Sequence, residues 1–204
     1  MFDFGGVISS SPFEAFERFE QDHGLPDGFI RLVNSTDPDT NAWARLERGE
    51  LDVDAFADAF RAEAATLGHP VDGRSVLAQL GGSIRPAMVD AVRRCSGPFR
   101  TACLTNNFTM DDLPHSPEVV AIFDLFDHVL ESRTLGVRKP DPRFYELACE
   151  AVSVDPTDVV YLDDLGINLK PARAMGMHTI KVTDAAQALA ELSAATGLSF
   201  DASS

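Results

Sequence analysis

The second half of the chain alternates between short apolar runs and helical patterns, and this alternation limits the possible folds more than any other feature. Four runs are typical of strands: "FRTACLTNN", "FDHVLES", "VVYLDD" and "HTIKV". Helical patterns lie around and between them in "RPAMVDAVRRC", "DPRFYELACEAV", "LKPARAMG" and "DAAQALAELSAATG". Strands that alternate with helices form parallel sheets whose faces the helices cover. The sequence therefore predicts an α/β fold with a parallel, helix-covered sheet.

The stretch from Pro12 to Gly82 lacks this alternation and is predicted to be mostly helical. Its apolar residues continue in a helical period, and no β-rich run interrupts them. The first helix has strong local signals: Ser11 as the cap, Pro12 at the first helical position, Glu14 completing a capping box and Gly24 as the stop. The helical stretch therefore separates the first residues from the alternating part.

Composition excludes several classes of function. The chain has 204 residues, of which 45% are hydrophobic, so it can bury a sizeable core. Its formal charge of −15 argues against binding to nucleic acid, which needs clustered Lys and Arg. No apolar run approaches the ~18 to 20 residues of a membrane span, and no signal peptide precedes Asp3. The three cysteines form neither a disulfide framework nor a CxxC pattern. We expect a soluble cytoplasmic protein without nucleic-acid or membrane partners; the sequence leaves the oligomeric state open.

Polar residues follow several of the predicted strands, and they are the candidates for a functional site. They are Asp3, Thr105, Asn106, Lys139, Asp163 and Asp164. Taken singly, an Asp-Asp pair after a strand is more often a turn, and a lone lysine is usually a surface group. Ligands of open α/β sheets, however, bind at the carboxyl edge, where such residues meet. Their order and context together favour a site at this edge.

The motifs that carry these residues resemble those of the haloacid dehalogenase-like hydrolases, a superfamily of mostly Mg²⁺-dependent phosphatases with a Rossmann-like sheet. The similar segments are "FDFGGVI", "LTNNF", "RKPDPRFYELA" and "YLDDLGINLKPARAMGMHTIKV", from Asp3 to about Val182. More narrowly, they resemble the N-terminal phosphatase domain of soluble epoxide hydrolase and the related domain fused to some acyl-CoA dehydrogenases. The resemblance implies a core domain of residues 1–11 and 83–204, with residues 12–82 as a helical cap inserted after the first strand.

The resemblance also implies roles for the residues that act on the substrate. Asp3 is expected to be the nucleophile that forms an aspartyl-phosphate intermediate. Thr105 and Asn106 offer a hydroxyl and an amide donor to phosphate oxygens. Lys139 places a compact positive charge near the nucleophile. Phosphoryl transfer needs mainly such positioning and charge neutralisation.

A metal site is implied by the same resemblance. Asp3 and Asp164 are expected to hold Mg²⁺ through hard carboxylate oxygens, together with the backbone carbonyl of Gly5. Asp163 is expected either to be a further ligand or to contact the ligands without binding the metal itself. Asn168 is expected to orient the metal-binding loop.

One position departs from the pattern of most phosphatases in the superfamily. They carry a second Asp two residues after the nucleophile, which serves as general acid and base, and here that position is Gly5. Relatives in the same branch also have glycine there. Loss of a general acid and base typically costs ~10²- to 10⁴-fold in rate, so we expect slow turnover. Asp37 and Asp39 of the helical stretch are conceivable substitutes.

Three functions remain open at this point. The favoured one is a Mg²⁺-dependent phosphatase acting on a small phosphorylated metabolite. A non-catalytic module that binds Mg²⁺ and phosphate, or a partner protein, has Gly5 as its support. A metal-independent dehalogenase uses the same nucleophile but loses the acidic pair, so Asp163 and Asp164 argue against it.

The chain begins unusually close to the first motif. Met1 and Phe2 alone precede Asp3, whereas a strand usually runs for ~5 to 6 residues. We expect the natural start to lie upstream.

Overall fold

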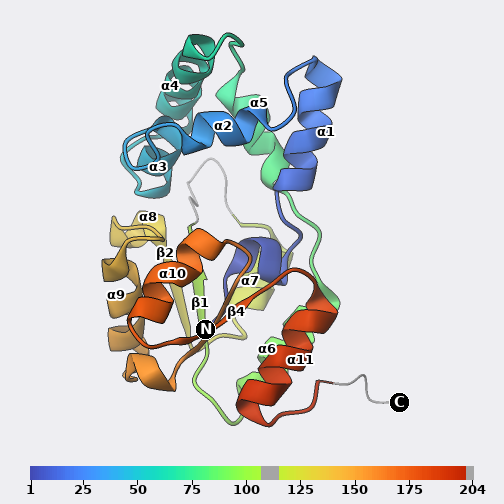
Figure 1. The fold of residues 1–204 in the computed structure, drawn as a ribbon, viewed down its shortest axis with the longest axis vertical. Coiled ribbons are helices and arrows are strands. Elements are labelled where there is room, and N and C mark those ends of the chain that lie inside the picture. The colour runs from blue at the N-terminus through green and yellow to red at the C-terminus, as the bar shows by residue number, and fades with distance from the viewer. Residues whose placement is uncertain (107–114, 201–204) are drawn as a thin grey trace.

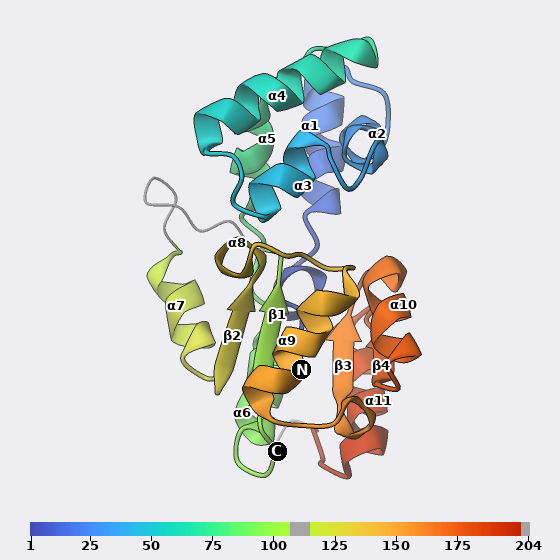
Figure 2. The same ribbon diagram turned by 90° about the vertical axis from the view of Figure 1, so that its left-hand side faces the viewer.

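The chain folds into a helical part and an α/β part, which lie at opposite ends of the molecule (Figures 1 and 2). The computed structural model describes residues 1–106 and 115–200. The last two residues of "LTNNF" therefore lie outside the described residues. Among the described helices, none combines the length and the apolar character that crossing a bilayer requires.

The α/β part is built on a parallel sheet, as the alternation of patterns predicts. Its strands are β1 (Ala102–Thr105), β2 (His128–Glu131), β3 (Val160–Asp163) and β4 (His178–Lys181). β1 pairs in parallel with β2, and β3 pairs in parallel with β4. Phe2 bridges the two pairs through parallel contacts with Cys103 on one side and Leu162 on the other. The order across the sheet is therefore β2, β1, residues 1–3, β3, β4 (Figure 2).

Backbone hydrogen bonds hold the first residues in the middle of this sheet. The amide of Phe2 donates to the carbonyl of Ala102 at 2.9 Å, and the amide of Leu104 donates to the carbonyl of Phe2 at 2.8 Å. On the other side, the amide of Asp3 donates to the carbonyl of Leu162 at 2.8 Å. Asp3 therefore lies at the carboxyl end of the central segment, residues 1–3, beside the end of β3.

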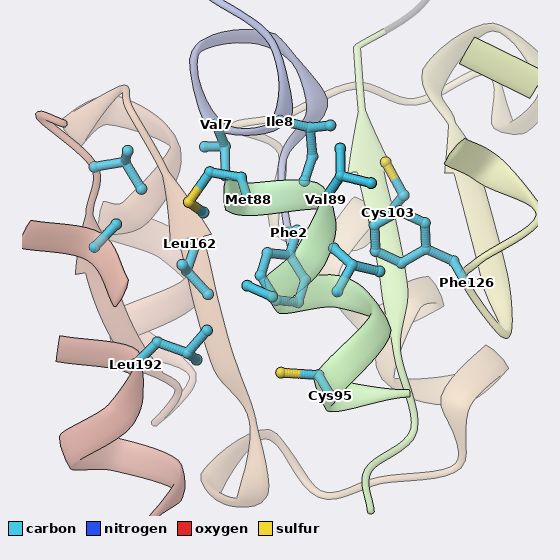
Figure 3. Packing of buried hydrophobic residues seen from close by; sticks show 14 of the residues in the cluster. Phe2, Val7, Ile8, Met88, Val89, Cys95, Cys103, Phe126, Leu162 and Leu192 are labelled. Carbon is cyan, nitrogen blue, oxygen red and sulfur yellow. The ribbon is translucent and has the colours of Figure 1, made fainter. Parts of the chain in front are cut away.

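Helices cover both faces of the sheet. Successive strand residues point to opposite faces, and buried apolar side chains lie on both. The helices of this part are α6 (Pro86–Cys95), α7 (Pro117–Phe123), α8 (Ser132–Leu135), α9 (Pro142–Val152), α10 (Gly166–Ala174) and α11 (Ala185–Thr196), with a 3₁₀ turn η3 (Pro156–Asp158). Phe2, Cys103 and Leu162 pack against α6 and α11 (Figure 3). Ala102 and Leu104 pack against α9 on the opposite face.

The helical part covers most of the stretch between the first motif and α6. It contains α1 (Phe13–His23), α2 (Phe29–Ser35), α3 (Ala42–Glu47), α4 (Val53–Thr66), α5 (Gly73–Leu77) and a 3₁₀ turn η2 (Ala78–Leu80). We call residues 13–80 the helical segment. Its buried residues, among them Phe16, Ile30, Leu46, Phe56 and Phe60, form a cluster drawn entirely from the segment itself.

The two connections between the parts run side by side. Ser9 and Ile84 form an antiparallel bridge, and the amide of Ser10 donates to the carbonyl of Ser83 at 2.8 Å. A Cβ at Gly82 would lie 2.8 Å from the carbonyl oxygen of Ser10, so the two chains approach closely here. This pairing ties the start of the helical segment to its end.

The local signals at α1 are partly wrong. The helix begins at Phe13, the residue before it is Pro12 in a helical conformation, and no side chain caps it. Ser11 therefore does not act as the cap; its hydroxyl lies by Asp164 instead of bonding to a free amide of the first turn. Gly24 does end the helix, in a left-handed conformation.

Glu20 of α1 organises the next helix instead. This carboxylate is 1% exposed and accepts hydrogen bonds from the backbone amides of Gly28 at 2.7 Å and Ile30 at 2.8 Å. These amides lie at the beginning of α2, where intrahelical partners are missing. A buried acid on one helix thus satisfies the end of another.

Candidate active site

A buried lysine joins two carboxylates at the carboxyl edge of the sheet. Asp3 ends the central segment, Asp163 ends β3, and Lys139 lies just before α9. The Nζ atom of Lys139 is 2.8 Å from Oδ1 of Asp3 and 2.9 Å from Oδ2 of Asp163. Lys139 is 1% exposed and Asp163 is fully buried. The structure therefore brings together three predicted site residues that are far apart in the sequence.

Burial and charge act against each other in this cluster. Burial alone would lower the pKa of Lys139, but the carboxylates of Asp163 and Asp3 together raise it above its ordinary value. Burial raises the pKa of Asp3 well above its usual range, despite Lys139, and the negative charges of Asp163 and Asp164 add to this. Additional positive charge at this place would favour the ionised form of Asp3.

Asp164 completes a group of three acids. Asp3, Asp163 and Asp164 each offer a carboxylate oxygen, and these oxygens lie within 4.8 Å of one another. Burial raises the pKa of Asp164 to about 6, with the charge of Asp163 as the next cause. Hard oxygen donors at this spacing suit a divalent cation such as Mg²⁺. The residues present therefore fit the metal that the resemblance implies.

Two glycines in the first motif shape this place in different ways. They lie in the turn η1 (Phe4–Ile8), where both have non-helical backbone angles and the amide of Ser9 donates to the carbonyl of Phe4 at 2.9 Å. Gly6 has φ +75°, and a Cβ there would lie 2.2 Å from Cγ of Asp164. Gly5 has φ −68°, and a Cβ there would meet nothing within 4 Å. Gly6 is thus required by the close approach of Asp164, whereas Gly5 is not.

The Ser11 hydroxyl, predicted as a helix cap, lies near the acids instead. It is buried and forms no hydrogen bond of normal geometry within the described residues. It lies near enough to Asp164 to lower the pKa of that carboxyl. A buried hydroxyl beside Asp164 is a further oxygen donor at this place.

Asp163 accepts hydrogen bonds from several groups around it. Its oxygens accept hydrogen bonds from Nζ of Lys139, the hydroxyl of Tyr161, the amide of Leu165 at 2.8 Å and Nδ2 of Asn168 at 3.1 Å. These bonds occupy most of its acceptor positions. Asp163 thereby fixes Lys139 and the loop that carries Asp164. The tyrosine was not predicted, because its strand position reads as an ordinary core residue.

Asn106 clamps the backbone of Lys139. Its Oδ1 accepts from the amide of Lys139 at 2.9 Å, and its Nδ2 donates to the carbonyl of Lys139 at 3.0 Å. Thr105, one residue earlier, is buried at the end of β1, level with Glu131 of β2. The structure thus places both residues at the same edge as Asp3, and the side chain of Asn106 hydrogen-bonds to the backbone of Lys139.

Glu47 of α3 reaches this edge from the helical segment, and the sequence analysis missed it. The side chain of Glu47 forms an ion pair with Arg138 and accepts from Nδ2 of Asn106 at 3.2 Å and from Nε1 of Trp43 at 2.9 Å. Its backbone carbonyl accepts from the hydroxyl of Ser132 at 2.6 Å. Burial raises the pKa of Glu47, and Arg138 opposes this shift.

The two acids considered as substitutes for the missing Asp lie elsewhere on the helical segment. Asp37 and Asp39 are exposed side chains on the loop before α3. The loop itself meets the α/β part, because the guanidinium of Arg138 donates to the carbonyl of Pro38 at 2.9 Å. Their role as substitutes stays a prediction.

Comparison with known proteins decides the family. The family model for haloacid dehalogenase-like hydrolases matches residues 1–176, which is most of the chain. The chain belongs to this family. The resemblance seen in the four motifs is therefore confirmed, and so is the Rossmann-type α/β fold.

The curated relatives include two long proteins and one of similar length. Acyl-CoA dehydrogenase family member 10 of Mus musculus is 35% identical over 97% of this chain, and bifunctional epoxide hydrolase 2 of the same species is 30% identical over 98%. The chain spans 19% and 39% of their lengths. Sesquiterpene phosphatase astK of Aspergillus oryzae is 27% identical over 94% of this chain and 93% of its own.

Solved structures share the fold. A haloacid dehalogenase family enzyme from Bacteroides thetaiotaomicron, in complex with magnesium and inorganic phosphate, has a TM-score of 0.58 at 18% identity, over 88% of this chain and 91% of that one. L-2-haloacid dehalogenase from Xanthobacter autotrophicus has a TM-score of 0.58 at 19% identity, over 96% and 81%. The fold is thus shared with a protein solved with magnesium and phosphate and with a dehalogenase.

Proposed function

We propose that this hydrolase is a Mg²⁺-dependent phosphatase that removes phosphate from a small metabolite through an aspartyl-phosphate intermediate. The observation that carries the proposal is the cluster of buried Asp3, Lys139 and Asp163 with half-buried Asp164 at the carboxyl edge of the sheet. It combines a nucleophile, a fixed positive charge and a set of oxygen donors. Relatives named as phosphatases support this choice within the family.

Each residue has a distinct part in the proposed reaction. A carboxylate oxygen of Asp3 attacks phosphorus, the bond to the leaving oxygen breaks, and water later hydrolyses the acyl phosphate. Lys139 stabilises the negative charge that builds up beside Asp3, and Thr105 donates its hydroxyl to a phosphate oxygen. Mg²⁺, when bound by Asp3 and Asp164 with the Gly5 carbonyl, supplies further charge neutralisation.

Gly5 makes the proposed enzyme slow. Without an acid two residues after Asp3, protonation of the leaving oxygen has no dedicated donor in the first motif. Turnover should then depend strongly on the leaving group, and phosphate esters of acidic alcohols or phenols should react fastest. The same absence supports the second candidate, a module that binds Mg²⁺ and phosphate without turnover.

The acidic cluster argues against a metal-independent dehalogenase. Asp163 and Asp164 add two negative charges beside Asp3, which itself carries a raised pKa. A nucleophile that displaces halide without a cation gains nothing from this repulsion. The cluster suits a site that holds a cation and a phosphate.

We further propose that residues 12–82 form a cap domain and that residues 1–11 and 83–204 form the core domain. The self-contained hydrophobic cluster of the helical segment supports this division, as do the paired connections at Ser9 and Ile84. Helix α3 lies at the same edge as the acids, through Glu47. A cap at this place would set which substrates enter, in keeping with a small phosphorylated substrate.

The experiment that tests the proposed function is phosphate release from p-nitrophenyl phosphate and a panel of metabolite phosphates, with and without Mg²⁺. Asp3→Asn removes the nucleophile, and Asp90→Asn, on the outer face of α6, is the matched control. We expect turnover that requires Mg²⁺, is lost in Asp3→Asn and persists in Asp90→Asn. Folded wild-type protein without turnover above Asp3→Asn would favour the binding module.

A further inference from the structure

Buried Glu47 links the helical segment to the candidate active site through polar contacts. It stands at the end of α3 and is 6% exposed, an unusual environment for a carboxylate. Donors reach it from both parts of the molecule: Trp43 from the helical segment, and Asn106 and Arg138 from the α/β part. A carboxylate that receives donors from both sides fixes their relative position.

The contacts continue from Glu47 to the proposed nucleophile. Nδ2 of Asn106 donates to Oε2 of Glu47 at 3.2 Å and to the carbonyl of Lys139 at 3.0 Å. Oδ1 of Asn106 accepts from the amide of Lys139 at 2.9 Å. Nζ of Lys139 lies 2.8 Å from Oδ1 of Asp3. Two residues, Asn106 and Lys139, thus connect Glu47 of the helical segment to the proposed reacting carboxylate of Asp3.

We propose that Glu47 is a positioning residue of the active site, which holds Asn106 and thereby sets Lys139 against Asp3. This inference rests on the proposed phosphatase function and adds to it a residue from outside the core motifs. In this arrangement the site is fully ordered when α3 is docked on the α/β part.

Stability alone does not account for this ion pair, in which Glu47 is buried and Arg138 is half-buried. Removing Glu47 and Arg138 from water carries a desolvation cost that largely offsets their attraction, so such pairs contribute little net stability. What they provide is a defined geometry. Here the geometry is that of Asn106 and the lysine backbone.

The test compares Glu47→Gln with Glu63→Gln. Gln at position 47 keeps one acceptor oxygen but turns an amide NH₂ toward one of the donors that the carboxylate now satisfies. Glu63 holds the other end of α3, where its carboxylate accepts from the amide of Ala42 at 2.7 Å. Both variants lose one charge near the same helix.

We expect kcat for an aryl phosphate to fall about tenfold in Glu47→Gln, with KM changed less than about twofold, because one charge-assisted hydrogen bond is lost. Glu63→Gln should leave both constants unchanged. Asn106→Ala should lower kcat similarly, and the double variant Glu47→Gln/Asn106→Ala should fall no further, since the two residues act in series.

Hydrogen exchange of the Lys139 backbone amide gives a second readout that does not need turnover. This amide is bonded to Oδ1 of Asn106, so its exchange should accelerate in Glu47→Gln and stay slow in Glu63→Gln. If Glu47→Gln is too unstable to study, Glu47→Gln/Arg138→Gln leaves no unpaired charge and replaces it in both assays.

The outcomes separate this inference from the proposed function. Unchanged kcat and unchanged Lys139 exchange in Glu47→Gln would overturn the inference, even with a wild-type enzyme that releases phosphate. Additive losses in the double variant would overturn it as well. Wild-type protein without turnover would overturn the proposed function, and the exchange measurement would still decide whether Glu47 positions Lys139.

Discussion

Replacement of Gly6 by alanine should damage both the stability and the metal site of the protein. At φ +75° an L-residue costs about 1–2 kcal/mol. Its Cβ would lie 2.2 Å from Cγ and from Oδ2 of Asp164, far inside contact distance. Asp164 would have to leave its rotamer, at a further cost of about 0.5–1.5 kcal/mol. The sum is a loss of about 1.5–3.5 kcal/mol in the free energy of unfolding.

The neighbouring glycine provides the matched control. Gly5 has φ −68°, and its Cβ would meet nothing within 4 Å, so Gly5→Ala should change the free energy of unfolding by less than about 1 kcal/mol. Urea denaturation with and without Mg²⁺ measures both effects. We expect Gly6→Ala to unfold at a lower urea concentration than the wild type. It should also gain little stability from Mg²⁺, because Asp164 is displaced.

The reasoning would be refuted by a Gly6→Ala protein that matches the wild type in urea midpoint and in its response to Mg²⁺. Equal damage in Gly5→Ala and Gly6→Ala would also refute it, since Gly6 alone of the two has a positive φ and lies against Asp164.

Three further predictions concern the rate, the metal site and the helical segment. Gly5→Asp, for which there is room, should raise kcat for an alkyl phosphate about 10²-fold, and an unchanged rate would contradict a missing acid. Because the pKa of Asp164 is raised to about 6, thermal stabilisation by Mg²⁺ should be full above that pH and decline as the pH falls through it; a pH-independent shift would be inconsistent. Glu20→Ala, which leaves the amides of Gly28 and Ile30 without their acceptor, should lower stability by about 2–4 kcal/mol in urea, and a loss below about 0.5 kcal/mol would argue against it.

The sequence predicts the sheet well because its signals are periodic and local. Apolar runs and helical patterns alternate, and the four strands appear where these runs lie. The same reasoning brings Asp3, Lys139 and Asp163 together, because parallel strands end at one edge. Helix boundaries are less accurate: α10 begins at Gly166, before the "LKPARAMG" run.

The contacts that sequence reasoning misses depend on residues far apart in the chain. Glu47 lies in a charged run, "RLERGE", that is typical of an exposed helix surface, and its partner Arg138 is 91 positions away. Ser11 fits a capping pattern, yet Pro12 takes the cap position and the hydroxyl turns toward Asp164. A glycine pair, likewise, does not reveal which of its members lies against a carboxylate.

The central position of the first residues has a consequence for how the chain folds as it is synthesised. The backbone nitrogen of Met1 donates to the carbonyl of Val160, 159 positions later, so the middle of the sheet cannot form until most of the chain exists. The helical segment does not depend on later residues in this way, because its hydrophobic cluster comes from residues 13–80. Contacts of long sequence separation form slowly, and local ones form early. On the ribosome, we therefore expect the helical segment to fold first. Phe2 and its neighbours should pair only after β1 and β3 have been synthesised.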